Sequence, residues 1–275
     1  MHLTAATADR HILYEEAVQN VDFELDFLQR IFKRKRNRKF HTLREDFCGT
    51  ANMACMWAER NWRNSAVGVD LHQPTLDWGV RNRVSRLEEA ANRLKLICAD
   101  VLTVQEPQVE VAVAFNYSYS VFKTRELLRR YFQVIHGALE DEGIFFIDAF
   151  GGTEATEELE EERDVDPSIA SDGTKVPGYT YIWEQVRFNP INHDILCKIH
   201  FGFKDGTRLD NAFTYDWRYW TLPELQEIML EAGFRETEVY VEGWDDDEDE
   251  ADGIFRRRTQ IEEMAGWVAY VVGLK

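Results

Sequence analysis

The chain has 275 residues, of which 44% are hydrophobic, and this is enough for a sizeable core within one elaborated α/β domain. Its formal net charge of −18 argues against nucleic acid as a partner, because phosphates must be met by positive charge. Four cysteines without a CxxC pair, and no apolar run near the roughly 20 residues that cross a bilayer, indicate a cytoplasmic protein with reduced thiols and no membrane contact.

The first expected element is an amphipathic helix over residues 14–32, followed by a basic run, KRKRNRK, at residues 33–39. The apolar stripe of this helix consists of Val21, Leu25, Leu28 and Phe32. The basic run has two interpretations. It is an exposed helix end, where cations suit the negative pole of the helix dipole, or it is a patch that faces RNA.

Strands and helices alternate through the next part of the chain. The first strand is expected at KFHTLR, residues 39–44, and is more polar than usual; apolar strands are expected at residues 65–70, 94–100, 109–118 and 143–150. Helical patterns between them cover residues 73–94 and 124–143, and Gly143 is expected to cap the second helix. Continuous apolar strands that alternate with helices indicate a parallel sheet covered by helices on both faces.

The pattern changes after residues 151–152, which are both glycine. Residues 154–175 are acidic and rich in turn-forming residues, which predicts a loop. Three strand-like runs follow within residues 179–217, and Asp205-Gly206 marks a hairpin turn between two of them. These runs predict an antiparallel insert in a parallel-sheet chain.

The α/β pattern resumes after the insert. Thr221 is expected to cap a helix that ends just before Gly233. Two final strands are expected at residues 236–244 and 266–275, and a solvated acidic loop at residues 245–252 separates them.

The stretch LREDFCGTA at residues 43–51 has the marks of a nucleotide-cofactor loop, with Glu45 shortly before a Cys-Gly-Thr turn. Ligands of such sheets bind beyond the carboxyl ends of the strands. Asp70 follows the second strand, Asp100 the third, and Asn116 ends the fourth. Polar residues thus follow four successive strands at one edge, where an acid can accept hydrogen bonds from ribose hydroxyls.

This constellation resembles the class I S-adenosylmethionine-dependent methyltransferases. Their first motif, a hydrophobic residue and an acid followed by x-G-x-G-x-G, corresponds to residues 45–51. Their acid after the second strand corresponds to Asp70 in GVDL, and their acid after the third strand to the pair Ala99-Asp100. The resemblance covers most of the chain and implies S-adenosyl-L-methionine as the cofactor.

The resemblance also implies the fold, an α/β seven-stranded, mostly parallel sheet flanked by helices, with an antiparallel insert before the last helix. The corresponding segments are an N-terminal helical cap at residues 1–40, a cofactor-binding core at 41–150, an antiparallel insert or lid at 151–217, and the remainder of the core at 218–275.

By this resemblance Glu45 lies near the methionine end of the cofactor, Gly49 packs against it, and Asp70 holds the ribose. Asp100 and Val101 flank the adenine. The full set of cofactor-binding residues that the resemblance implies is Glu45, Phe47, Cys48, Gly49, Asp70, Leu71, Asp100, Val101 and Asn116.

Two further residues are candidates for the cofactor site. Arg44 is the cation nearest in sequence to the loop and would pair with the carboxylate of the cofactor. Tyr14 would cap the site from the N-terminal helix, or it packs on the core as an ordinary helix aromatic.

Phe47 and Ala51 stand where the family has its two outer glycines. Alanine is tolerated if its backbone dihedral angles are ordinary. Phenylalanine is tolerated only if its φ is negative and its ring turns away from the cofactor. We therefore expect a negative φ at Phe47.

The acceptor site is expected around Tyr117 and Tyr119, which follow the fourth strand. Trp217, Arg218 and Trp220 would line an acceptor lid, with Arg218 clamping a carboxylate or phosphate. Alternatively, this aromatic segment is a strand that packs on its sheet. No residue is identifiable as a general base or as a metal ligand.

The expected function is methyl transfer from S-adenosylmethionine to a small-molecule acceptor by in-line displacement, in which positioning supplies on the order of 7–11 kcal/mol. One alternative is an RNA or protein methyltransferase that docks through the basic run. Another is a protein that binds S-adenosylmethionine without catalysis. A nicotinamide oxidoreductase is a third, although the CGTA turn lacks the GxGxxG pattern that binds a pyrophosphate. The sequence gives no indication of the oligomeric state.

Overall fold

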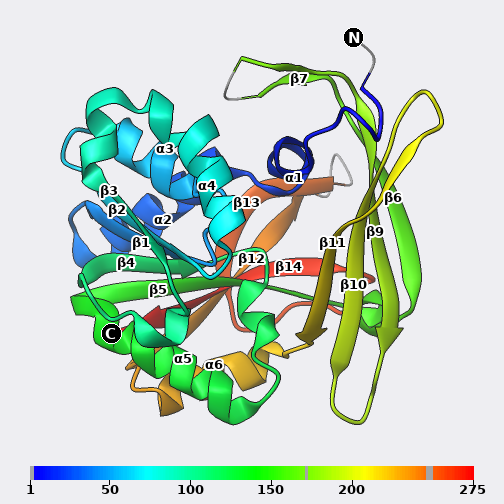
Figure 1. Cartoon of the computed structure of the whole chain (residues 1–275). Helices are drawn as coiled ribbons and strands as arrows, with labels where there is room; N and C mark the ends of the chain where they lie inside the picture. The colour runs from blue at the N-terminus through cyan, green and yellow to red at the C-terminus, as the bar shows by residue number, and fades with distance from the viewer. Residues whose placement is uncertain (1–2, 171–172, 246–249) are drawn as a thin grey trace. The chain divides into compact units, whose positions relative to one another are not determined.

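The structure, a computed structural model, describes residues 3–170, 173–245 and 250–275 (Figure 1). The chain separates into two compact units. The insert unit consists of Met1–Gln19 and Thr156–Tyr219, and the core unit consists of Asn20–Ala155 and Trp220–Lys275.

The core unit contains an eight-stranded sheet with the order β13-β12-β14-β5-β4-β1-β2-β3. Its strands are β1 (Thr42–Asp46), β2 (Ser65–Asp70), β3 (Leu94–Cys98), β4 (Val109–Ala114), β5 (Leu139–Gly151), β12 (Glu236–Asp245), β13 (Glu250–Arg258) and β14 (Trp267–Leu274). Strands β1 to β5 pair in parallel, whereas β14 is antiparallel to β5 and β12, and β13 is antiparallel to β12. The predicted fold class is confirmed, but the predicted count of seven strands is wrong by one.

The additional strand is β13, in and after the stretch predicted as a solvated acidic loop at residues 245–252. Residues 246–249 of that stretch lie outside the described residues. From Glu250 onward the chain pairs with β12, up to the pair Val239↔Arg258. On an edge strand charged side chains face water, so the sequence lacks the apolar alternation that signals a strand.

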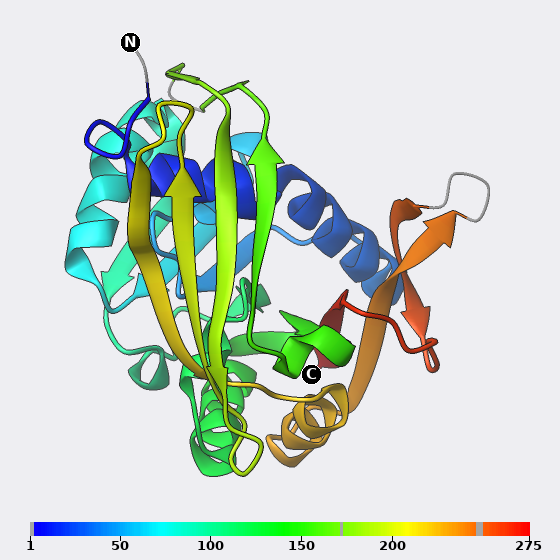
Figure 2. The ribbon, with the colours of Figure 1, turned by 90° about the vertical axis from the view of Figure 1, so that its right-hand side faces the viewer.

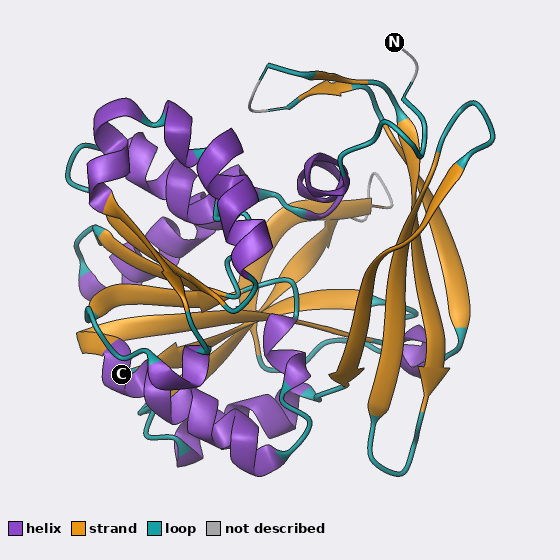
Figure 3. Cartoon of the chain, viewed as in Figure 1, coloured by secondary structure: helices purple, strands orange, loops and turns teal. Residues whose placement is uncertain are grey.

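Helices cover both faces of this sheet (Figure 3). They are α2 (Val21–Arg36), α3 (Asn52–Arg60), α4 (Gln73–Asn82), α5 (Arg125–Ala138) and α6 (Leu222–Glu231), and the unit also has short 3-10 turns at Val84–Arg86, Glu88–Arg93, Val101–Thr103 and Ser118–Val121. Within the described ranges no helix is both long enough and apolar enough to span a membrane.

The two faces of the sheet belong to two separate hydrophobic clusters. Residues of α2 and α3 pack in one cluster, on what we call the α2 face, and residues of α5 and α6 pack in the other, on the α5 face. Along β5 the side chains alternate, since Ile144 and Phe146 lie on the α2 face and Phe145 and Ile147 on the α5 face. The next residue of the strand, Asp148, therefore points to the α2 face.

The predicted helix over residues 124–143 is shorter in the structure. Helix α5 ends at Ala138, and β5 begins at Leu139. Gly143 does not cap the helix. It lies within β5, where an added Cβ would come within 2.8 Å of the Leu139 Cβ, so glycine permits a close approach of the chain to itself.

Two other predicted helices are interrupted. The helix predicted over residues 73–94 ends at Asn82 and continues as two 3-10 turns, the second of which begins at Glu88 with a left-handed φ of 47°. The helix predicted over residues 14–32 is two helices, α1 (Arg10–Val18) and α2, because the backbone of Asn20 leaves the helical region. Thr221 caps α6 as predicted, in a reciprocal capping box with Glu224.

The insert unit contains a four-stranded antiparallel sheet with the order β11-β10-β9-β6, seen in Figure 2. Its strands are β6 (Leu159–Val165), β9 (Tyr179–Phe188), β10 (Asp194–Gly202) and β11 (Arg208–Arg218), and β7 (Ser168–Ile169) and β8 (Lys175–Val176) form a separate two-stranded ribbon. The turn at Thr153–Thr156 precedes β6. The antiparallel insert is confirmed, but the loop predicted at residues 154–175 contains β6 and β7. The five charged residues of β6 hide its strand pattern, and β7 has only two residues.

The basic run at residues 33–39 forms the last turn of α2 and the connection to β1, so the helix-end interpretation is confirmed. Asn37 ends the helix with a left-handed φ of 54°. Lys35 Nζ lies 2.6 Å from the carboxylate of Glu238, and Arg36 donates to the carbonyl of Glu142 at 2.6 Å. Much of the run is therefore engaged by the core unit itself.

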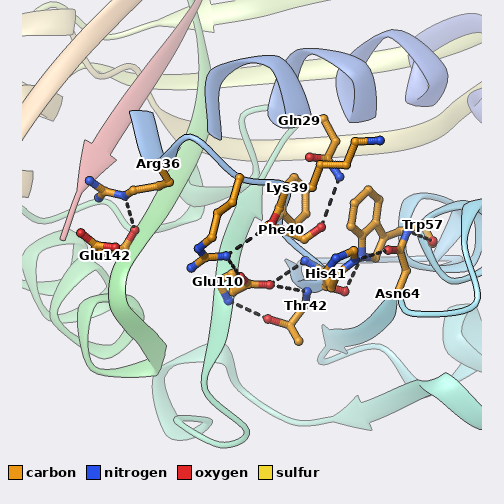
Figure 4. Close-up of polar contacts among 11 residues, drawn as sticks. Gln29, Arg36, Lys39, Phe40, His41, Thr42, Trp57, Asn64, Glu110 and Glu142 are labelled. Atoms are coloured by element: carbon orange, nitrogen blue, oxygen red, sulfur yellow. Dashed lines mark hydrogen bonds and ion pairs between the residues drawn. The ribbon is translucent and has the colours of Figure 1, made fainter. Parts of the chain in front are cut away.

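Glu110 organises the same connection (Figure 4). Its carboxylate pairs with Arg38 and accepts the N–H groups of His41 and Thr42 at 2.6 and 3.2 Å. Trp57 donates to the carbonyl of His41 at 3.1 Å. These contacts lie at the amino end of β1, the opposite end from the predicted cofactor loop.

Candidate cofactor and acceptor site

The loop after β1 has an alternating left-handed backbone. The φ angles of Phe47, Gly49 and Ala51 are 54°, 53° and 59°. These are the three positions at which the methyltransferase motif has glycines, and glycine is the residue that adopts this conformation most readily. The expectation of a negative φ at Phe47 is wrong. A left-handed conformation costs a non-glycine residue about 1–2 kcal/mol, so the surrounding structure must stabilise this loop.

Aromatic packing of the Phe47 ring stabilises the left-handed backbone at this residue. Its ring centroid lies 5.7 Å from that of Tyr131 and 6.0 Å from that of Phe122, both in edge-to-face orientation. These rings belong to the cluster on the α5 face. The ring of Phe47 therefore joins the hydrophobic core, and this contact offsets part of the backbone strain.

Hydrogen bonds hold the turn between its two strained ends. Gly49 donates its N–H to Asp70 Oδ2 at 2.8 Å, and Cys48 donates to the carbonyl of Val69 at 3.0 Å. A Cβ added to Gly49 would meet only Thr75 Cγ2, at 3.8 Å. The backbone at Gly49 is thus open to close approach by a ligand, as a cofactor loop requires.

Glu45 anchors the helix that follows the loop. Its carboxylate accepts the N–H of Ala54 at 2.8 Å, in the first turn of α3. The residue at the N-cap position, Ala51, has no side chain that can do this. A carboxylate at a helix N-terminus also interacts favourably with the helix dipole.

Asp70 holds two turns at once. In addition to the Gly49 contact, its Oδ1 accepts the N–H of His72 at 2.7 Å. Each carboxylate oxygen has a second lone pair, so the fixed carboxylate can still accept hydrogen bonds from ligand hydroxyls. Leu71, between these residues, is 71% exposed, so its side chain is accessible to a ligand.

Asp100 caps the 3-10 turn after β3. Its Oδ1 accepts the N–H of Leu102 at 2.9 Å, and the residue is exposed. Val101 is buried in the cluster on the α5 face. The two predicted adenine neighbours therefore differ in their availability to a ligand.

The end of β4 is held by an acid that the sequence prediction missed. Asn116 and Tyr117 have left-handed φ angles of 56° and 57°, and their N–H groups donate to the two carboxylate oxygens of Asp148 at 2.8 and 2.9 Å. Asp148 is buried, and burial raises its pKa to about 7 although the N–H groups of Tyr117 and Asn116 act in the opposite direction. An acid inside the apolar run GIFFIDAF was the available signal.

Tyr117 and Tyr119 differ in their suitability as acceptor contacts. The Tyr117 ring is half-buried, and its centroid lies 4.8 Å from that of Phe150. Tyr119 is buried, and its hydroxyl donates to the carbonyl of Asp148 at 2.9 Å. This position does not fit the prediction that Tyr119 contacts the acceptor, because the side chain is part of the core.

Arg44 also departs from its predicted role. Its guanidinium is buried and binds the carboxylate of Asp46 through two nitrogens, at 2.7 and 3.2 Å, and the carbonyl of Val104 at 2.7 Å. Tyr131 donates to the same carboxylate at 2.9 Å. The side chain is 1% exposed and is paired within the core, so Arg44 does not fit the predicted role of pairing with the cofactor carboxylate.

The remaining predicted residues belong to different units. Trp220, in the core unit, is buried, and its indole N–H donates to the carbonyl of Phe122 at 3.2 Å, so it does not fit a lid. In the insert unit, Trp217 stacks on Tyr215 with 4.3 Å between ring centroids. Tyr14 packs on Phe213 at 4.9 Å, also in the insert unit.

An aromatic row thus runs along one face of the insert sheet. Its members are Tyr181, Trp183, Phe213, Tyr215 and Trp217, and Tyr14 of α1 packs on Phe213. Arg218, the last residue of β11, directly follows the row in sequence. Among the described residues there is no group of three or more His, Cys, Asp or Glu that would hold a metal ion.

The fold is similar to that of solved methyltransferases. A crystal structure of an S-adenosylmethionine-dependent methyltransferase from Clostridium acetobutylicum has a TM-score of 0.66 at 16% identity, and the match covers 95% of this chain and 96% of that one. The SAM-bound amino pentose methyltransferase CalS10 from Micromonospora echinaspora has a TM-score of 0.65 at 12% identity, with 96% of each chain covered.

A third structure agrees. The sugar N-methyltransferase KedS8 from Streptoalloteichus has a TM-score of 0.63 at 13% identity, and the match covers all of this chain and 94% of that one. By sequence the chain matches no protein-family model and no curated protein. At these identities the likeness shows the fold, which is that of the S-adenosylmethionine-dependent methyltransferases.

Proposed function

We propose that this protein is an enzyme that transfers a methyl group from S-adenosylmethionine to a small-molecule acceptor. The observation that carries the proposal is the loop after β1, in which residues 47, 49 and 51 are left-handed and the Gly49 amide is bound by Asp70. A strained loop persists only where the rest of the structure over-determines it, and such loops cluster at functional sites. The fold of the solved neighbours supports the same assignment.

The residues present fit this cofactor. The open backbone at Gly49 would lie against it, and Glu45 would fix the start of α3 beside its methionine end. Asp70 would accept hydrogen bonds from the ribose hydroxyls. Leu71 and Asp100 would border the adenine. Bound there, the cofactor would supply an activated methyl group with a good leaving group.

The role of this chain's own residues would be to position the acceptor and exclude water, which accounts for much of the barrier reduction in such displacements. The solved neighbours include proteins named as amino pentose and sugar N-methyltransferases. The acceptor would be of similar size and would carry hydroxyl or amino groups.

The RNA alternative has weaker support. Lys35, Arg36 and Arg38 of the basic run contact the core unit. Charge reversal of the run should abolish activity on RNA but leave a small-molecule reaction unchanged. A protein that binds the cofactor without catalysis would instead show binding and no turnover against any pool of acceptors.

The test is calorimetric titration with S-adenosylhomocysteine, with NADH as the control ligand. Saturable binding of the first ligand alone supports the proposal, and Asp70→Ala should weaken it by about tenfold or more, or about 1.4 kcal/mol. Asp141→Ala is the matched control. Asp141 is an exposed aspartate near the start of β5, whereas the candidate site lies at the opposite ends of the parallel strands. Binding of neither ligand would overturn the proposal.

A further inference from the structure

An acid of α2 is buried in the core unit without an ionic partner. Glu24, in the first turn of α2, is 8% exposed. Among the residues that the structure describes, its carboxylate takes part in no hydrogen bond or ion pair. Burying an unpaired carboxyl group is costly, so packing alone does not account for a glutamate here.

Glu24, Asp148 and Tyr270 lie on the same side of the sheet, the α2 face. Phe27, one turn further along α2, packs on Tyr270 with 4.6 Å between ring centroids. Residues three apart on a helix share a face, so Glu24 is directed to the same surface as Phe27. Tyr270 is the cross-strand partner of Asp148 in the β14–β5 ladder, and both point to the α2 face.

Acidic and hydroxyl groups act on the hydroxyl of Tyr270. Beyond burial, the groups that raise its pKa are Glu24, Asp148, Tyr117 and Glu242. Within the described ranges the Tyr270 hydroxyl has no hydrogen-bond partner. We call Glu24, Asp148 and Tyr270 the buried acidic cluster. Two carboxyl groups and a hydroxyl with unused acceptor capacity match the three N–H donors of an ammonium group.

The cluster lies near the carboxyl end of β4, and the candidate cofactor loop follows the carboxyl end of the neighbouring strand β1. Ile147 pairs with Ala114, the last residue of β4, so Asp148 lies just past the end of that strand. Asp148 also binds the N–H groups of Asn116 and Tyr117, which begin the loop after β4. In sheets of this kind ligands bind beyond the carboxyl ends of the strands.

We propose that the buried acidic cluster binds the amino group of the methyl acceptor, so that the substrate is an amine methylated on nitrogen. This inference rests on the proposed function. Glu24 is the base that takes the proton of the amine. Asp148 holds the loop after β4 and adds negative charge, and the Tyr270 hydroxyl is a further hydrogen-bond acceptor.

The protonation of the cluster is consistent with this role. Burial, and then the charge of Asp148, raise the pKa of Glu24 to about 8, and burial raises the pKa of Asp148 to about 7. Near neutral pH the free cluster therefore retains protons. An incoming ammonium group stabilises both carboxylates and displaces a proton to solvent.

The reaction then balances as follows. The amine enters as an ammonium ion, and the carboxylate of Glu24 takes one of its protons, which frees the nitrogen lone pair. This lone pair forms a bond to the methyl carbon as the bond between carbon and sulfur breaks. The electrons of the broken bond remain on sulfur, which becomes a neutral thioether. The product is an N-methylammonium ion, and Glu24 returns its proton to solvent.

The experiment compares two cofactor analogues by calorimetry. S-adenosylhomocysteine lacks the methyl group, and sinefungin carries an ammonium group on a carbon that replaces the sulfonium. The wild-type protein should bind sinefungin about tenfold more tightly or better, because a charge-assisted contact is added. Glu24→Gln should remove this preference and change the affinity for S-adenosylhomocysteine by less than about twofold. Binding of sinefungin, but not of S-adenosylhomocysteine, should release a proton from the protein. Proton release is measured by calorimetry near pH 7 in buffers of different ionisation enthalpy.

The matched control is Glu238→Gln. Glu238 is also buried, but it pairs with Lys35, eleven residues or about 16 Å further along α2, and its substitution should leave the preference unchanged. Tyr270→Phe is a second variant, expected to reduce the preference without removing a charge. Equal affinity of the wild type for both analogues, or a preference that Glu24→Gln and Tyr270→Phe leave intact, would overturn the inference but not the proposed function. Binding of neither analogue would overturn both.

Discussion

The amide nitrogen of Gly49 lies 2.8 Å from Oδ2 of Asp70, so the acid that ends β2 holds the turn that follows β1. Any ligand that binds Asp70 is thereby placed next to the open backbone of the turn. The same contact helps to maintain the left-handed residues on either side of Gly49. Asp70 is thus a structural residue of the loop as well as a candidate ligand contact.

The strain at Ala51 gives a first testable prediction. Ala51→Gly removes a buried methyl group worth about 0.8 kcal/mol, but it also relieves about 1 kcal/mol of left-handed strain. We expect the free energy of unfolding to change by less than about 0.5 kcal/mol. Ala54→Gly is the control, because Ala54 is equally buried but lies within α3, and it should lose about 2 kcal/mol. Equal losses in urea denaturation would show that residue 51 is not strained.

The sequence was sufficient for the α/β alternation and for the acids at strand ends. Asp70 and Asp100 follow short apolar runs. The run of β2 is buried, as a strand inside a parallel sheet requires, whereas β3 is a partly exposed edge strand that is still mostly apolar. The sequence was not sufficient for β6 and β13. Both are edge strands with mostly exposed, charged side chains, so their pairing is set by the neighbouring strand and leaves no apolar pattern.

The candidate site was only partly predictable for a similar reason. A left-handed φ at Phe47 contradicts the local preference of phenylalanine and depends on Tyr131 and Phe122, which are distant in sequence. Arg44 was misassigned because its partner Asp46 lies two residues away on the same side of β1. Neither fact can be read without knowing which face of the strand is buried.

The raised pKa values of Glu24 and Asp148 determine how stability depends on pH. Their folded values, about 8 and about 7, lie above the ordinary values of carboxyl groups, so the folded state binds more protons than the unfolded state between about pH 4 and 8. Stability therefore falls as pH rises through this range. We expect the free energy of unfolding to be at least about 2 kcal/mol lower at pH 8.5 than at pH 5.5.

Glu24→Gln should flatten this dependence, because glutamine has no proton to lose. The measurement is urea denaturation of both proteins at the two pH values. A wild-type protein that is equally stable at both, or a variant with an unchanged slope, would show that Glu24 titrates normally.

The buried pair of Arg44 and Asp46 provides a separate test of the site. Arg44→Met leaves the buried carboxylate of Asp46 without its charged partner and should destabilise the protein by about 3–5 kcal/mol. The double variant Arg44→Met, Asp46→Leu removes both charges and should recover much of the loss. Because Arg44 is buried and paired within the core, the folded fraction should bind S-adenosylhomocysteine with wild-type affinity. Affinity reduced more than about tenfold in the double variant would restore Arg44 to the cofactor site.

Two lysines of the basic run separate its structural role from any role in binding. Lys35 contacts the buried carboxylate of Glu238 at 2.6 Å, and that carboxylate also meets Arg257 at 2.9 Å and the Tyr240 hydroxyl at 2.6 Å. Lys35→Met should therefore destabilise the protein by about 1–3 kcal/mol, because it removes one donor to a buried charge and leaves the others. Lys33 is exposed on the same helical turn, so Lys33→Met should change stability by less than about 0.5 kcal/mol. Thermal or urea unfolding of the two variants distinguishes them. If both are neutral, the run does not stabilise the core unit, and the nucleic-acid interpretation regains support.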